Sequence, residues 1–453
     1  MKPFTVEEAC KAVSGWQKTP FSGTIQKVTT DSRQDLDQSL FIPLKGEKFD
    51  GHAFLQTALE QGACCALSME ATSQERVIYV EDTRRALGAL AAWYRRRFTL
   101  PVAAITGSVG KTSTKEMTAA VLSAKFDVCK TQGNYNNDIG LPKTLFSLEE
   151  HHTAAVVEMG MNHFGELHTL SKMAAPSLAV ITNIGVAHIE NLGSQEGIFQ
   201  AKCEIFDGMA QDAPAVLNGD DPYLLTLKQK RKNLLFCGLE EENTLRAKNI
   251  RPQGLSQTAF TICYHGQQEE AVIAAAGTHM VQNALLAVGV GLKFGLSLQE
   301  AAQALGNFQQ TGMRMAVKKT PFLTVLNDSY NANPISTKAS LQVLAAEQGR
   351  KVAVLGDMLE LGPEAAAYHE EVGRFAKQVG IDFLIAIGPF GEYISKGFDA
   401  AGGASVHYPS VDAFFAAPWQ TLFHKGDTVL VKASHSMALS RIAEGLQEVN
   451  KGV

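Results

Sequence analysis

The sequence lacks three features that would assign it to a familiar class of protein: paired cysteines, a long apolar run and an N-terminal leader. Its seven cysteines are odd in number and scattered, with no CxxC pair, so neither a disulfide framework nor a zinc site is expected. The apolar stretch 271–292 is interrupted by polar residues, whereas a membrane span needs about 20 nearly uninterrupted apolar residues. The N-terminal segment MKPFTVEEACKAV carries two glutamates and no apolar core, unlike a signal peptide. We therefore expect a cytoplasmic protein with reduced cysteines.

A surplus of positive charge is also missing. The chain has 41 Lys and Arg against 46 Asp and Glu, which gives a net charge of −5. Because phosphate backbones favour a basic protein surface, this balance argues against a nucleic-acid partner. It does not exclude a nucleotide-sized anion, which backbone N–H groups in a short loop can bind.

The chain does have enough apolar residues for several hydrophobic cores. Of its 453 residues, 45% are apolar and 19% are charged. Because a single core stops growing near about 250–300 residues, we expect more than one domain. From Pro101 onward, short apolar runs alternate with helical segments. This alternation predicts a parallel sheet covered by helices, with strands at 102–106, 154–158, 178–182 and 213–217 and helices at 111–124 and 195–208.

A second alternating series begins near residue 316 and predicts a smaller doubly wound domain. Its expected strands are 322–327, 351–356, 383–388 and 427–432. At the N-terminus, short strand candidates at 24–30, 39–44, 63–67 and 77–80 and a helix near 52–60 predict a compact α/β module. We predict an α/β protein of three domains, at 1–82, 83–314 and 315–453, with a central P-loop-type parallel sheet, a Rossmann-like C-terminal domain and a hinge at 311–315.

The sharpest local signal is AAITGSVGKTSTKE, in which a Gly-containing turn joins an apolar strand to a helix. Gly107 and Gly110 allow the backbone to approach a phosphate, and the N–H groups at the helix start point at the anion. Lys111 is placed to reach the β- and γ-phosphates, and the Thr112 hydroxyl to bind Mg²⁺. The match is partial, because the pattern GxxxxGK[ST] requires glycine where Ile105 stands. A chance Gly-rich turn is the alternative, and the flanking strand and helix argue against it.

Three further side chains are candidates around this loop. Glu158 closes the strand 154–158, and P-loop enzymes use an acidic residue on a neighbouring strand end to hold Mg²⁺. His188 follows the next strand and is a candidate ligand of a second metal, although a lone histidine is more often a packing or capping residue. Lys202, in GIFQAKCEIF, looks like a helix lysine with an exposed amine, and the residues alone give it no function.

Together these motifs resemble the Mur ligase family. The phosphate loop is similar to that family's ATP loop, whose shortened glycine spacing accounts for Ile105. Other stretches resemble its metal-site and substrate segments: TDSR (30–33), EMGMNHFGE (158–166), TNIGVAHIENLGS (182–194), AKCEIF (201–206), LNDSYNANPIS (326–336), GDMLELG (356–362) and VKASHSMAL (431–439). The resemblance covers essentially the whole chain. DSYNANP and GDMLELG resemble the members that add D-alanyl-D-alanine to a UDP-N-acetylmuramoyl tripeptide.

The resemblance implies a role for each matching position in binding ATP and metal. The implied ATP-binding residues are Gly107, Ser108, Val109, Gly110, Lys111, Thr112, Ser113, Asn283, Arg314 and Asp328. Among these, Asn283 would contact adenine, Asp328 the ribose and Arg314 the phosphates. Two Mg²⁺ ions are implied, with Thr112, Glu158, His188 and a carbamylated Lys202 as ligands. The implied catalytic residues are Lys111, Glu158, His188 and Lys202.

The resemblance also implies substrate contacts in all three domains. In the N-terminal domain, Ser32, Arg33, Lys45 and Gly46 would hold the UDP-sugar, although DSR is equally a capped turn. In NYNND, Asn134, Asn136 and Asn137 would lie near the reacting carboxylate, or simply form a polar loop. In the C-terminal domain, the residues implied in dipeptide binding are Tyr330, Asn331, Asn333, Lys432, Ser434 and His435.

The expected function is an ATP-dependent amide ligase acting through an acyl phosphate, with small-molecule substrates, no nucleic acid and a monomeric chain. It would join UDP-N-acetylmuramoyl-tripeptide and D-alanyl-D-alanine. One alternative is a ligase of the same family that adds a different amine. Another is a P-loop kinase or GTPase, but these use the longer loop, and no NKxD-type motif is present. A third is a catalytically silent UDP-sugar-binding protein, against which the intact Lys111, Thr112, Glu158 and His188 argue.

Overall fold

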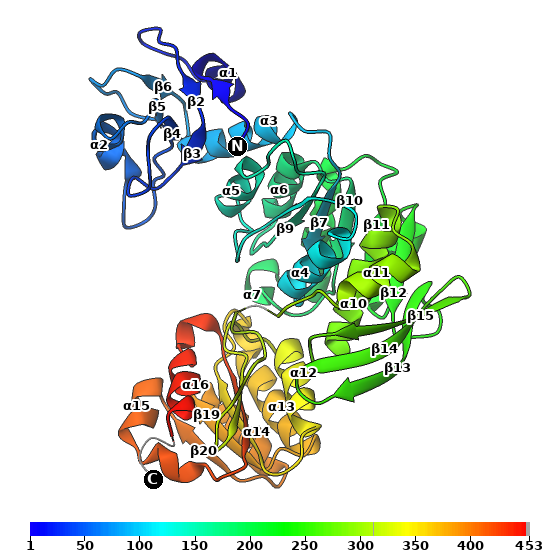
Figure 1. The fold of residues 1–453 in the computed structure, drawn as a ribbon. Coiled ribbons are helices and arrows are strands. Elements are labelled where there is room, and N and C mark those ends of the chain that lie inside the picture. Colours follow the sequence, from blue (N-terminus) through cyan, green and yellow to red (C-terminus); the bar gives the residue numbers. More distant parts are fainter. Residues whose placement is uncertain (311, 450–453) are drawn as a thin grey trace. The chain divides into compact units, whose positions relative to one another are not determined.

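The computed structural model describes residues 1–310 and 312–449 (Figure 1). The chain forms two compact units, and each draws on several segments of the sequence. The first comprises Met1–Thr106, Lys125–Val180 and Lys202–Ala215. The second comprises Gly107–Ala124, Ile181–Ala201 and Val216–Val453, of which 311 and 450–453 lie outside the described residues.

The N-terminal module has a parallel sheet in the order β3-β4-β5-β6. Its strands are β3 (Lys27–Thr29), β4 (Ser39–Phe41), β5 (Cys65–Ser68) and β6 (Val77–Tyr79). A separate antiparallel pair, β1 (Phe4–Thr5) and β2 (Thr24–Ile25), flanks the helix α1 (Val6–Ala12). The predicted helix near 52–60 is the 3₁₀ turn η1 (Gly51–Phe54) followed by α2 (Leu55–Glu60). Leu55 and Leu59 of α2 pack with Phe41 in one buried core.

The central sheet has nine strands in the order β15-β14-β13-β12-β11-β10-β7-β9-β8. The first six strands along the chain are β7 (Val102–Thr106), β8 (Val128–Lys130), β9 (Ala154–Glu158), β10 (Leu178–Ile181), β11 (Ala215–Asn218) and β12 (Leu234–Gly238). β7, β9, β10 and β11 are buried along their whole length, as their continuous apolar runs predict. β9 pairs in parallel with β7 and with β8, and Ile105 lies opposite Glu158.

Helices precede, follow or separate these strands along the chain, and α4 begins where the helix 111–124 was predicted. They are α3 (Thr83–Arg95), α4 (Lys111–Leu122), α5 (Gly140–Phe146), α6 (Glu166–Ala174), α7 (Ile189–Leu192), α8 (Gln195–Cys203), α9 (Pro222–Leu225), α10 (Thr278–Lys293) and α11 (Leu298–Leu305). The predicted helix 195–208 continues past α8 as the 3₁₀ turn η2 (Glu204–Gly208), and a second such turn, η3 (Thr226–Gln229), follows α9. Within the described residues, no helix is long and apolar enough to cross a membrane.

One part of the central sheet was not predicted. β13 (Leu245–Gln253), β14 (Gln257–Tyr264) and β15 (Gln267–Ile273) extend it as an antiparallel meander. The exposed half of β13 is polar, so it lacks the apolar run that marked the other strands. The turn between β14 and β15 places His265 and Gly266 at φ of 46° and 83°, the conformation of a tight hairpin turn.

The C-terminal sheet has the order β16-β17-β21-β18-β19-β20. Its strands are β16 (Ala316–Lys319), β17 (Thr324–Asn327), β18 (Lys351–Gly356), β19 (Phe383–Ile387), β20 (Ser405–Tyr408) and β21 (Thr428–Lys432), and only β16 pairs antiparallel. Alternate residues of the four inner strands enter two separate cores. In β18, Ala353 and Leu355 pack with one core, and Val352 and Val354 with the other. The sheet is therefore covered on both faces, as predicted for a doubly wound domain.

Helices on the two faces complete these cores. α12 (Pro334–Ala345), α13 (Ala365–Gln378) and α14 (Gly391–Ala400) contribute to one core, and α15 (Val411–Ala416) and α16 (Ser440–Gln447) to the other. Short 3₁₀ turns η4 (Gly362–Glu364), η5 (Trp419–Leu422) and η6 (His435–Met437) connect the elements. The predicted α/β fold class is confirmed. The exact domain boundaries and the hinge stay predictions, and Thr311 of the proposed hinge lies outside the described residues.

Candidate functional site

The phosphate loop lies between β7 and α4, and its two glycines are required by their surroundings. Gly107 has φ of 147°, and a Cβ there would lie 1.8 Å from Oγ1 of Thr182. Gly110 has φ of 86°, and a Cβ there would lie 2.6 Å from Oδ1 of Asn283. Ile105 is fully buried inside β7. The position where the longer pattern has glycine is therefore a core strand residue in this chain.

The turn after β10 braces this loop. The backbone N–H of Ser108 donates to the Asn183 carbonyl (3.1 Å), and that of Val109 donates to Asn183 Oδ1 (2.9 Å). Gly185 N–H donates to the Ser108 hydroxyl at 2.8 Å. No side chain caps α4, whose first turn includes Ser113. Because the N–H groups at a helix start favour an anion, this end of α4 remains the predicted phosphate site.

Lys111 and Thr112 follow the loop at the start of α4. The Lys111 Nζ donates to the carbonyl of Gly107 at 2.7 Å. The Thr112 hydroxyl accepts a hydrogen bond from Arg314 Nη2 at 3.1 Å, across a sequence separation of 202 residues. The Arg314 guanidinium also stacks over the ring of Tyr330, 4.0 Å from its centroid. The structure thus brings together Thr112, Arg314 and Tyr330, residues predicted for metal, ATP and dipeptide binding.

Glu158 and Asn136 form a second group in the first unit. Glu158 is 1% exposed, and its Oε1 accepts from Asn136 Nδ2 at 2.8 Å. The Thr131 hydroxyl accepts from the Glu158 backbone N–H at 3.0 Å. Asn137 has a local role, since its Oδ1 accepts from the N–H of Gly140 at the start of α5. Asn136 is therefore the asparagine of NYNND that lies against the acidic residue.

His188 has a partner that sequence reasoning missed. Its Nδ1 lies 2.6 Å from Oε2 of Glu360, in the stretch GDMLELG. Both residues have positive φ, 64° and 63°, which non-glycine residues rarely adopt. Hydrogen bonding to His188 holds the pKa of Glu360 below its usual value. A lone glutamate in a loop gives no signal of such a contact, because the two residues are far apart in sequence.

The prediction that Lys202 carries an exposed amine is wrong. Lys202 lies near the end of α8 and is 1% exposed. The same helix buries Ile198, Phe199 and Ala201, so this face of α8 packs inward. Burying a lysine is costly unless its charge is paired or removed. Little in the sequence indicates this burial, because the helix shows only weak amphipathic periodicity.

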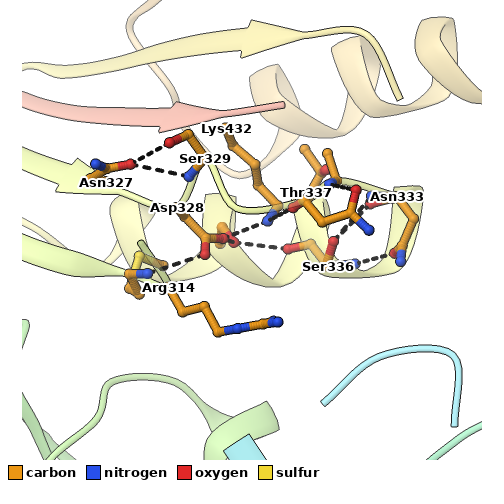
Figure 2. Close-up of polar contacts among 12 residues, drawn as sticks. Arg314, Asn327, Asp328, Ser329, Asn333, Ser336, Thr337 and Lys432 are labelled. Carbon is orange, nitrogen blue, oxygen red and sulfur yellow. Dashed lines mark hydrogen bonds and ion pairs between the residues drawn. The ribbon is translucent and has the colours of Figure 1, made fainter. Parts of the chain in front are cut away.

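Asp328 and Lys432 form a buried ion pair (Figure 2). Lys432 Nζ lies 2.5 Å from Asp328 Oδ2 and donates to the carbonyl of Asn331 at 2.9 Å. The same carboxylate accepts from the Ser340 hydroxyl at 2.6 Å and from the Met315 backbone N–H at 3.1 Å. Asp328, the predicted ribose contact, therefore forms an ion pair with Lys432, a predicted dipeptide contact.

The other residues predicted to bind the dipeptide lie around this pair with local partners. The His435 ring lies 5.8 Å from that of Tyr330. The Ser434 hydroxyl accepts from the N–H of Leu359 at 2.9 Å. Asn333 caps α12 through a reciprocal capping box with Ser336. These contacts give Asn333 a structural role and leave its dipeptide contact a prediction.

The residues predicted to bind the UDP-sugar follow two neighbouring parallel strands. Arg33, after β3, pairs with Asp31 (2.8 Å), whose Oδ1 also accepts the Arg33 N–H, so DSR does form a capped turn. Lys45, after β4, lies 3.6 Å from Asp50. Because carboxyl ends of parallel strands meet at one edge, Ser32, Arg33, Lys45 and Gly46 follow the same edge. Beside them, Phe49 and Phe54 stay 55% and 41% exposed, an aromatic pair that sequence reasoning missed.

Three domains of the Mur ligase family match the chain: the catalytic domain at residues 24–95, the middle domain at 105–291 and the glutamate ligase domain at 313–435. A UDP-N-acetylmuramoyl-tripeptide–D-alanyl-D-alanine ligase of Bacillus subtilis (strain 168) is 38% identical over 98% of both chains.

Two solved structures are similar along nearly the whole chain. MurF from Acinetobacter baumannii has a TM-score of 0.92 and 32% identity over 99% of both chains. The MurF ligase from Thermotoga maritima in complex with ADP has a TM-score of 0.86 and 28% identity over 94% of this chain and 98% of that one. The likeness therefore extends from the N-terminal module to the C-terminal sheet.

Proposed function

The chain belongs to the Mur ligase family, and from that premise we propose that it is the ligase that adds D-alanyl-D-alanine to UDP-N-acetylmuramoyl-tripeptide. The products are UDP-N-acetylmuramoyl-pentapeptide, ADP and phosphate, in the synthesis of peptidoglycan. The observation that carries the proposal is the end-to-end match to a ligase of that name, which leaves no domain unmatched. We place the reaction in the cytoplasm and expect a monomeric enzyme.

The chemistry follows from the poor reactivity of a carboxylate toward an amine. An oxygen of the tripeptide carboxylate attacks the γ-phosphorus of ATP, the bond to the bridging β,γ-oxygen breaks, and ADP leaves. The amine nitrogen of D-alanyl-D-alanine then attacks the acyl carbon of the acyl phosphate. A tetrahedral intermediate collapses, phosphate leaves, and the nitrogen loses its proton as the amide forms. The protein contributes position and charge neutralisation to both steps.

The residues of the phosphate loop perform the first task. Backbone N–H groups at the start of α4 bind the phosphates, and Lys111 and Arg314 neutralise the charge that develops during transfer. The contact of Arg314 with Thr112 supports its assignment to the phosphate end of ATP. Asn283, which borders Gly110, is assigned to adenine, and Asp328 to the ribose.

Two Mg²⁺ ions fit the chemistry of the proposed donor set. Thr112 offers a hydroxyl, Glu158 a buried carboxylate and His188 an imidazole, and the first two are the oxygen donors that Mg²⁺ prefers. When bound, the ions neutralise the repulsion between the acceptor carboxylate and the triphosphate. Asn136 orients Glu158, and Glu360 orients His188.

We assign Lys202 a carbamylated side chain. Carbamylation converts a cationic amine into a carboxylate-like oxygen ligand, and it requires a neutral amine. Burial favours the neutral form of an amine over the charged form, and Lys202 is buried. Intact-mass measurement under CO₂ at alkaline pH tests the assignment, with a Lys202→Ala variant as control. An unmodified mass in an active enzyme overturns it.

The three predicted domains divide the substrates among them. Residues 1–82 bind the UDP-sugar, 83–314 bind ATP, and 315–453 bind the dipeptide. Closure of these domains around the substrates would exclude the water that hydrolyses an acyl phosphate.

The proposed function is tested by phosphate release from purified protein with ATP, Mg²⁺ and UDP-N-acetylmuramoyl-tripeptide. Release is expected only when D-alanyl-D-alanine is added, together with a product of pentapeptide mass. L-alanyl-L-alanine and single D-alanine are the matched control amines. Equal release with a different amine transfers the protein to another member of the family, and release that needs no amine refutes the ligase.

A further inference from the structure

Lys432 and Asp328 are adjacent because of the register of the C-terminal sheet. β17 and β21 run parallel, with Asn327 opposite Val431, so the next residue of each strand is also a neighbour. Neighbouring strands are about 4.8 Å apart, within reach of a lysine and an aspartate on the same side. Lys432 is only 3% exposed, and the side chain of Asp328 is 15% exposed. The pair is therefore shielded from water and from charged ligands.

The Asp328 carboxylate connects three separate segments. Oδ2 accepts from Lys432 and from the hydroxyl of Ser340 in α12, and Oδ1 accepts from the backbone N–H of Met315. A carboxylate has about four acceptor positions, so three of them are occupied. One position remains for a ribose hydroxyl. Without Lys432, the carboxylate would keep the Ser340 hydroxyl and the Met315 N–H as neutral donors but lose the lysine that pairs with it.

The contact with Met315 affects Arg314, the residue before it. Met315 has φ of 53°, a left-handed conformation that a non-glycine residue adopts only when its surroundings enforce it. The hydrogen bond to Asp328 is one such constraint. The Arg314 side chain next to it extends away from the Asp328 carboxylate (Figure 2). Its guanidinium contacts the Tyr330 ring and the Thr112 hydroxyl. The Asp328 carboxylate is therefore hydrogen-bonded to the backbone immediately after Arg314.

We propose that Lys432 is a positioning residue for ATP. It holds the Asp328 carboxylate in place, and through the Met315 N–H it holds Arg314 against the phosphate loop. This assignment rests on the proposed function and changes the expected role of the lysine, which the sequence placed among the dipeptide contacts. Two of the three Lys432 donors already have protein acceptors, and the residue is only 3% exposed, which argues against a direct contact with a dipeptide carboxylate.

Two substitutions separate these roles. Lys432→Met keeps the length of the side chain and removes its charge. Ser340→Ala removes a neutral donor from the same oxygen of Asp328 and leaves the ion pair intact, so it is the milder variant and should fold if Lys432→Met does not. Binding of ADP alone, measured by calorimetry on the full chain, reports on the nucleotide site whether or not ligation occurs.

Lys432→Met is expected to weaken ADP binding and raise the KM for ATP by about tenfold, with the KM for D-alanyl-D-alanine changed by less than about twofold. Ser340→Ala should shift the ATP values in the same direction by about twofold. A raised dipeptide KM with unchanged ADP binding overturns the proposal, because Lys432 then contacts the dipeptide. Unchanged ADP binding in both variants also overturns it. If wild-type protein binds ADP but ligates no dipeptide, the proposed function fails while the ADP comparison still tests the positioning role.

Discussion

The phosphate loop and the C-terminal strand ends are both assigned to ATP binding in our proposal, but they are built from different groups. In the proposed site the loop binds an anion with backbone groups, and its residues lie within seven positions of one another, from Gly107 to Ser113. The C-terminal strand ends instead depend on buried side-chain charges, Asp328 and Lys432, separated by 104 residues. A site made of backbone and glycine is therefore visible in a short motif. A site made of paired side chains becomes visible only when the sheet register brings them together.

The largest expected effect lies in the loop. Lys111→Ala removes the charge placed to reach the phosphates, and we expect phosphate release to fall by about 100-fold or more, with little change in thermal stability. Lys228→Ala, on an exposed lysine outside the site, is the control and should keep wild-type turnover. A Lys111→Ala enzyme with full turnover would remove the catalytic role from the loop.

The next prediction tests whether the loop requires a residue without a Cβ at Gly107. Gly107→Ala places a Cβ 1.8 Å from Oγ1 of Thr182, and we expect about 3 kcal/mol of lost stability together with loss of ADP binding. Gly133→Ala is the matched control, because its φ is also positive, 52°, but nothing lies within 4 Å of the added Cβ. Urea unfolding of both variants checks the difference. Equal losses would mean that backbone strain, and not the close approach to Thr182, makes the glycine necessary.

A third prediction concerns a buried charge on the C-terminal side. Burial raises the pKa of Asp357 to about 6, although its carboxylate accepts the N–H of Phe390 at 3.0 Å. Because the pKa of Asp357 is higher in the folded chain than in the unfolded chain, the protonated carboxyl favours the folded state. This contribution to the unfolding free energy is present below about pH 4 and is lost as the pH rises through 6. The unfolding free energy of the wild-type protein should fall between pH 4.5 and 7. In the Asp357→Asn variant this fall should be smaller by about 1–2 kcal/mol. Parallel pH profiles would contradict this assignment.

The smallest effect concerns the contact between His188, which follows β10, and Glu360, which follows β18. Glu360→Gln keeps the shape of the side chain next to His188 but removes its charge, and we expect turnover to fall about threefold. Glu364→Gln, on an exposed glutamate four residues later, is the control. Steady-state phosphate release distinguishes them. Identical rates in both variants would show that His188 does not depend on Glu360 for its orientation.

Much of the fold was predictable because its strands are buried on both faces. 102–106, 154–158 and 351–356 were predicted to the residue, since a continuous apolar run between turns has few alternatives. The meander β13–β15 was missed because its strands are partly exposed and polar. Its hairpin turn at His265 and Gly266 left only a weak signal, because histidine rarely occupies a left-handed position.

The sequence by itself determined the phosphate loop and the class of fold, because glycine conformations, helix starts and apolar periodicity depend on neighbours along the chain. Only the tertiary structure decided which polar residues act together. It buried Lys202, placed Glu360 against His188, and paired Lys432 with Asp328. The physical reason is that charge pairing and burial depend on distance in space, and strand register, not sequence separation, sets that distance.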